Sequence, residues 1–273
     1  MRIVFLGTSA GEEYPGAWCV CENCEKARKW GGRNIRRNSG VILDGDVMID
    51  MGKTAHIQAE KFNINLRGIK FLLSTHSHWD HLNTHTLWSR IAAFGPGEMP
   101  ELNIFGSSRV ADVLAESDRM NPESLKIKIN MIEPFKKYYA GDLEFFTLDG
   151  NHSDGGGVRS VNYIITRKNK TFAYLSDTGY PFDETLKALT KYKYDFIIAE
   201  CTFLYGEDNP AHMGINQNIR LLGFFGANNL WKNKPEYYLT HISPHWCPPH
   251  DEYEPLVKSK GMKLAYDGLV IEY

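Results

Sequence analysis

The feature that most constrains this chain is a nine-residue stretch, Ser74 to Leu82, with the sequence STHSHWDHL. It directly follows the apolar run IKFLL, which is typical of a buried strand. Within six residues the stretch holds four residues of types that bind metals: His76, His78, Asp80 and His81. Neutral imidazole and carboxylate suit zinc, manganese, iron or nickel. If the backbone leaves the strand in a turn, His76 and His78 converge and Asp80 and His81 face a neighbouring point. The sequence therefore predicts a site for two metal ions.

One strand end cannot surround two ions, so further ligands must come from elsewhere in the chain. Three later apolar, β-prone runs are each followed by a ligand-type residue: His152 after LEFFTLDGN, Asp177 after TFAYLS and His241 after EYYLT. Rigid strands hold geometry while the loops beyond them give access. We therefore expect these three side chains to complete the site.

Strands and helices alternate through both halves of the chain, which predicts a layered α/β architecture. The apolar patterns predict strands at 2–7, 40–52 (a hairpin), 69–76, 102–107, 128–135, 142–153, 159–166, 170–179, 194–203, 235–241 and 264–273. They predict helices around 24–31, 83–94, 108–117, 183–192, 215–228 and 256–262. No internal repeat or linker divides the chain, so residues 1–273 are predicted to form a single domain.

Charge and composition limit the partners and the location that we expect for the protein. The net charge of −2 gives no overall basic field for nucleic acid or anionic lipid. The sequence has no apolar run of about 18 residues and no signal-peptide pattern, so we expect a cytoplasmic protein without a membrane span.

Three cysteines are bunched as C-x-C-x-x-C, at Cys19, Cys21 and Cys24. In a reducing compartment such thiols favour metal binding over disulfides. A structural zinc site needs four ligands. The segment HISPHWCPPHD offers three candidates for the fourth, of which the first is favoured: His245, Cys247 and His250.

The motifs STHSHWDHL, GNHSD, YLSDTG and LTHIS, in that order, resemble those of the metallo-β-lactamase superfamily. The resemblance covers essentially the whole chain and implies a four-layer αββα sandwich with the metals at one edge between two sheets. It implies that one ion is held by His76, His78 and His152. It implies that the other is held by Asp80, His81 and His241, with Asp177 bridging. Asp50, in VMIDMG, would hydrogen-bond a ligand histidine and fix its orientation.

The cysteine-rich loop, with a histidine shortly after the last active-site ligand, resembles the PhnP-like phosphodiesterases; Pro244 is an extra residue relative to that pattern. The segment ECTF and the later His212 resemble a segment of phosphodiesterases and transfer-RNA 3′-processing nucleases. There a histidine holds a phosphate oxygen or protonates the leaving oxygen. The resemblance thus implies hydrolysis of a small, possibly cyclic, phosphodiester by a hydroxide held between two zinc or manganese ions, with Asp80 orienting the nucleophile.

Other functions stay open because this fold hosts many chemistries. A transfer-RNA 3′-processing nuclease is disfavoured because no arm-sized insertion interrupts the ligand positions and the net charge is −2. A thioesterase or lactonase is a second alternative, and a non-catalytic PqqB-like carrier, which also has an N-terminal cysteine-rich loop, is a third. We expect a small-molecule substrate and no nucleic-acid or membrane partner, and the sequence leaves a homodimer open.

Overall fold

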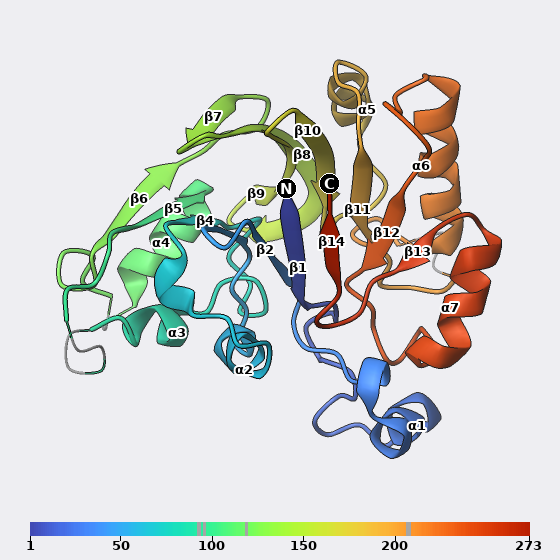
Figure 1. The fold of residues 1–273 in the computed structure, drawn as a ribbon, viewed down its shortest axis with the longest axis horizontal. Coiled ribbons are helices and arrows are strands. Elements are labelled where there is room, and N and C mark those ends of the chain that lie inside the picture. The colour runs from blue at the N-terminus through green and yellow to red at the C-terminus, as the bar shows by residue number, and fades with distance from the viewer. Residues whose placement is uncertain (92–93, 95–96, 118–119, 206–208) are drawn as a thin grey trace.

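Two seven-stranded mixed sheets face each other at the centre of the molecule (Figure 1). The structure, a computed structural model, describes residues 1–273 except 92–93, 95–96, 118–119 and 206–208. The first sheet contains, in spatial order, β14 (Val270–Glu272), β1 (Arg2–Gly7), β2 (Gly40–Leu43), β3 (Val47–Ile49), β4 (Phe71–Leu73), β5 (Leu102–Gly106) and β6 (Ile127–Met131). The second contains β13 (Lys263–Leu264), β12 (Tyr237–Thr240), β11 (Phe196–Glu200), β10 (Lys170–Leu175), β9 (Val158–Arg167), β8 (Leu143–Gly155) and β7 (Lys137–Ala140).

Helices cover the outer faces of both sheets. The first sheet is covered by α2 (Ala55–Lys61), α3 (Thr84–Trp88) and α4 (Ser108–Glu116). The second is covered by α5 (Asp183–Leu189), α6 (Ile215–Ala227) and α7 (His250–Ser259). Helix α1 (Glu22–Trp30) lies below α7 beside the N-terminal loop (Figure 1), with Ala27 buried in the hydrophobic cluster beneath the helices of the second sheet and Lys26 paired with Glu252 of α7. This is the αββα sandwich expected from the sequence. Among the helices that the structure describes, none is long and apolar enough to cross a membrane.

The strand sequences explain the layering, because successive side chains of a strand point to opposite faces. On β10, Phe172 and Tyr174 lie in the hydrophobic cluster between the two sheets. Ala173 and Leu175 lie in the cluster beneath the helices of the second sheet. Strands buried on both faces therefore read as continuous apolar runs such as TFAYL and FIIAE.

Most predicted elements are confirmed, and four are corrected. The strand predicted at 142–153 continues to Gly155, so His152 lies inside β8 rather than beyond its end. The segment 264–273 forms two strands in different sheets, since the chain turns at Gly268, where φ is 88°. β7 and α2 were not predicted as separate elements.

Two helices differ from their predicted ranges. The helix predicted at 256–262 begins at His250, where Pro249 is the N-cap and acidic residues occupy the first turn. Pro255 inside this helix obscured its pattern. The helix predicted at 83–94 extends only over α3, capped by the Asn83 side chain, and residues 92–93 lie outside the described residues.

Candidate metal centre

The histidine-rich stretch forms a turn directly after β4. The backbone N–H groups of His81 and Leu82 both donate to the carbonyl of His78 at 2.8 Å. The hydroxyl of Ser74 donates to the carbonyl of His76 at 2.9 Å. These bonds fold the turn back on itself, which brings its imidazole and carboxylate groups to one side.

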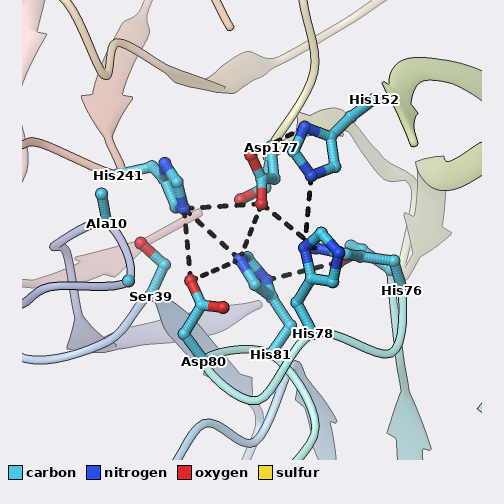
Figure 2. A network of polar contacts seen from close by, with 12 residues as sticks. Ala10, Ser39, His76, His78, Asp80, His81, His152, Asp177 and His241 are labelled. Atoms are coloured by element: carbon cyan, nitrogen blue, oxygen red, sulfur yellow. Dashed lines mark hydrogen bonds and ion pairs between the residues drawn. The ribbon is translucent and has the colours of Figure 1, made fainter. Parts of the chain in front are cut away.

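The turn and three distant segments bring their side chains together (Figure 2). Two groups form, in each of which the ligand atoms lie within 4.8 Å of one another. The first group consists of His76, His78, His152 and Asp177. The second consists of Asp80, His81, His241 and Asp177. All seven residues predicted from the sequence are therefore brought together, and Asp177 belongs to both groups.

Left-handed backbone conformations direct three of the side chains at this centre. Asp50, Asp177 and His241 come shortly after β3, β10 and β12, with φ of 60°, 49° and 57°. Such values are uncommon outside glycine, and Asp and His adopt them more readily than most residues. They turn the chain sharply where each strand ends. His152 reaches the centre differently, because the β8–β9 register is interrupted between Asp149 and Ser153.

Asp50 fixes the orientation of two histidines. Its carboxylate is fully buried and accepts from the N–H of Thr75 at 2.8 Å and from the Thr75 hydroxyl at 3.0 Å. It also lies 2.9 Å from Nδ1 of His81, which must donate, so His81 presents Nε2 without a proton. Because the Thr75 hydroxyl donates to Asp50, it accepts from Nδ1 of His76 at 3.0 Å. His76 therefore also presents a bare Nε2.

Glu200 fixes His241 in the same way. Its buried carboxylate accepts from the N–H and the hydroxyl of Thr202 at 2.7 and 2.8 Å. The same hydroxyl lies 2.8 Å from Nδ1 of His241 and has no further proton to give. His241 therefore donates from Nδ1 and presents a bare Nε2.

These bare nitrogens face other electron-rich atoms, so the centre needs positive charge. Nε2 of His81 lies 3.3 Å from Nε2 of His241 and 3.2 Å from a carboxylate oxygen of Asp177. Burial opposes a second proton on His81, yet the charges of Asp80 and Asp50 keep its pKa well above the usual value, so this proton sits on Nε2 unless a metal ion takes its place. Burial lowers the pKa of His76 to about 3, which keeps it in the neutral form that binds metal. The donor set therefore fits divalent metal ions.

His212 lies at the rim of this centre. Its Nδ1 is 2.9 Å from Asp177 Oδ1 and 3.3 Å from Glu200 Oε1, and its side chain is 21% exposed. Burial works against its charge, but the carboxylates of Asp177 and Glu200 beside Nδ1 raise the pKa of His212 to about 10. A protonated histidine thus lies at the exposed side of the cluster. Residues 206–208, in the loop that leads to it, lie outside the described residues.

The three clustered cysteines form a second group. The sulfur atoms of Cys19, Cys21 and Cys24 lie within 4.8 Å of one another. Nδ1 of His245 is 3.6 Å from the Cys19 sulfur. The other two candidates for a fourth ligand have different contacts. The thiol of Cys247 points to the carbonyls of Cys201 and Thr202. Nδ1 of His250 accepts from the Arg36 guanidinium at 2.9 Å. The geometry therefore favours His245.

Three supporting residues were missed from the sequence: Thr75, Glu200 and Asp154. Asp154 is buried and accepts from the N–H and hydroxyl of Ser77 at 2.8 and 2.7 Å, between two ligand histidines. Its place in GNHSD, two residues after His152, was the available signal. Thr75 and Glu200 are ordinary strand-end residues whose roles appear only in three dimensions.

The family-model comparison agrees with this geometry. A model described as the beta-lactamase superfamily domain matches residues 46–242. The chain belongs to this superfamily. No curated protein matches the chain by sequence.

Several solved structures share the whole fold. A diphosphatase of the PhnP family is 21% identical, with a TM-score of 0.77, over 100% of this chain and 97% of that one. Zn²⁺-bound PqqB from Methylobacterium extorquens is 17% identical, with a TM-score of 0.79, over 100% of both chains. Human tRNase Z, short form, is 17% identical, with a TM-score of 0.64, over 100% of this chain and 99% of that one. The predicted likeness to PhnP-like proteins is confirmed at the level of the fold.

Proposed function

We propose that this protein is a metal-dependent phosphodiesterase that hydrolyses a small phosphodiester. The observation that carries the proposal is the position of His212, 2.9 Å from Asp177 at the exposed rim of a buried His/Asp cluster. A metal centre with a protonated histidine at its edge suits a substrate that carries negative charge and needs a proton on its leaving group.

Two divalent ions, zinc or manganese, would occupy the centre. One would be held by His76, His78 and His152, and the other by Asp80, His81 and His241, with Asp177 contacting both. When bound, the ions would lower the pKa of water to supply the nucleophile and would polarise a phosphoryl oxygen.

The chain's own residues would position the substrate and move the proton. Nδ1 of His212 is directed at Asp177 and Glu200, so its other ring nitrogen, Nε2, is the one that would meet a phosphate or leaving-group oxygen. Glu200, which is not among the proposed metal ligands, would keep His212 charged until it donates. Asp80, beside Nε2 of His81 at 3.3 Å, would orient the nucleophile as well as bind metal.

A structural zinc is part of the same proposal. Three thiolates and one imidazole would hold the zinc, from Cys19, Cys21, Cys24 and His245. The short distances among their sulfur atoms, without disulfides, support it.

The test is hydrolysis of bis(p-nitrophenyl) phosphate by the protein as purified, after chelation, and after metal is restored. His212→Ala should lower kcat by about 100-fold or more while the bound metal stays unchanged. His85→Ala, on an exposed position of α3, is the matched control and should leave kcat unchanged. Full activity of His212→Ala would refute the role assigned to His212.

The alternatives predict different outcomes. Strong, salt-dependent binding of transfer RNA would favour a processing nuclease. Turnover of thioesters or lactones without turnover of phosphodiesters would favour hydrolysis of a carbon-based bond. Metal-loaded protein that hydrolyses none of these substrates would favour a carrier.

A further inference from the structure

A cavity of about 790 Å³ lies between the cysteine loop and the turn that carries the histidines. Its lining includes Glu12, Trp18, Val20, Lys53, Trp79 and His245. The volume is within the range of pockets that hold small organic ligands, and far exceeds the needs of a phosphate alone.

The cavity adjoins the metal centre. Trp79 stands between His78 and Asp80 in the histidine-rich turn. Gly11 lies against the same turn, because a Cβ there would be 3.3 Å from the Asp80 carboxylate and 3.6 Å from the Trp79 ring. A molecule with its phosphate at the His/Asp cluster would thus extend along Trp79 into the cavity.

The apolar lining is unusually exposed. Trp18 is 99% exposed, Val20 83% and Trp79 52%. Exposing these side chains forfeits the free energy that burial of their apolar surface would give. Lys53 places its ammonium 4.2 Å from the centre of the Trp79 ring. Indole rings stack on planar aromatic ligands. The charge of Lys53 is already shared with Glu13, whose carboxylate oxygen lies 3.7 Å from the ammonium.

We propose that this cavity is the subsite for the aromatic base of a nucleotide-type phosphodiester, with the base stacked on Trp79. This inference rests on the proposed function, since it places the phosphate at the metal centre. Stacking tolerates any base because every base has a π face. The subsite therefore selects nucleotide substrates over sugar phosphates without distinguishing purines from pyrimidines.

The experiment compares equilibrium binding of adenosine 5′-monophosphate and ribose 5-phosphate to the metal-loaded protein by calorimetry. The two probes share sugar and phosphate and differ in the base. The wild-type protein should bind the nucleotide roughly 5- to 150-fold more tightly, the range expected for one stacked base. Trp79→Leu should remove this preference, and Trp79→Phe, which keeps a ring, should retain most of it.

Trp30→Leu is the matched control. Trp30, at the end of α1, is 42% exposed and also has a lysine near its ring, Lys26 at 5.9 Å. It is not part of the cavity lining. This variant should keep the nucleotide preference of the wild type, and circular dichroism of all variants shows that each one folds.

Equal affinity for the two probes, or a preference that survives Trp79→Leu, would overturn the subsite. The hydrolysis assay keeps the two proposals separate. Turnover of bis(p-nitrophenyl) phosphate without a nucleotide preference would refute only the subsite. A nucleotide preference without turnover would refute only the proposed phosphodiesterase activity.

Discussion

The substitution Asp50→Asn tests how the protein prepares its histidines for metal. Asp50 accepts from two groups of Thr75 and from Nδ1 of His81, all within 3.0 Å. An asparagine has the same shape but only one acceptor oxygen, and its amide nitrogen donates. Asparagine also tolerates the φ of 60° at this position, so the backbone is not disturbed.

The expected loss follows from the geometry. If the amide oxygen faces Thr75, the amide nitrogen meets Nδ1–H of His81, and one buried donor is left unpaired. His81 can relieve this only by moving its proton to Nε2, which removes a metal ligand. An unpaired buried donor costs about 1–3 kcal/mol. That range corresponds to roughly 5- to 150-fold in metal affinity, in line with about 10- to 100-fold for partners of metal-bound histidines.

The assay is competition for metal against a chelator of known affinity, with the bound metal counted. Asp112→Asn, which removes the same charge from an exposed position of α4, is the control for long-range electrostatics and should bind metal as the wild type does. If Asp50→Asn binds metal with wild-type affinity and stoichiometry, the hydrogen bond to Asp50 does not set the tautomer of His81, and the reasoning fails.

Three further predictions concern stability. Cys21→Ser should lose about one metal per chain and lower the melting temperature, because metal binding at such sites is coupled to folding; unchanged stoichiometry in metal analysis would contradict the zinc site. His250 is 1% exposed, and burial, with a neighbouring guanidinium charge, lowers its pKa to about 4. In the unfolded chain this histidine has a pKa of about 6.5, so between pH 6.5 and pH 4 the unfolded state binds more protons than the folded state. The free energy of unfolding is therefore highest above pH 6.5 and falls by about 3 kcal/mol toward pH 4. Denaturant titrations of His250→Gln should show a flatter pH dependence; an identical slope would refute this. A Cβ on Gly52 would lie 2.1 Å from the Asp80 carbonyl, so Gly52→Ala should destabilise by about 2 kcal/mol or more and weaken metal binding. Gly223→Ala, where a Cβ meets nothing within 4 Å, should be tolerated in the same thermal melts.

The ligands could be predicted from the sequence because the ends of several strands meet at one edge of the sandwich. Asp177 and His241 follow apolar runs that are buried on both faces, so their positions can be predicted from hydrophobicity alone. His152 was placed correctly at the site for a partly wrong reason. Its strand does not end there, and only the broken register of β8 turns its side chain inward. A local irregularity of this kind has no hydrophobic signature.

The residues that orient the ligands were harder to predict. Glu200 is the fifth and last residue of β11 and contacts His241 through Thr202. Asp154 supports the N–H of Ser77 across 77 positions of sequence. Their residue types are common and their partners are remote in the chain, so no spacing rule connects them. Only the parallel pairing of β11 with β12 brings Thr202 and His241 within reach.

The cysteine cluster explains how an exposed loop can form one wall of a cavity. Trp18 and Val20 lie almost entirely in solvent, so burial of apolar surface does not hold this segment in place. Its fixed points are the buried Tyr14, the thiols, gathered within 4.8 Å, and Asn23, which donates to the carbonyls of Pro244 and Cys247. His245 is only four residues beyond His241, so a zinc bound there would also anchor the loop that presents a ligand to the metal centre. A zinc at this position would add a metal tie to these anchors and would leave the indole of Trp18 free to face the cavity rather than the protein interior.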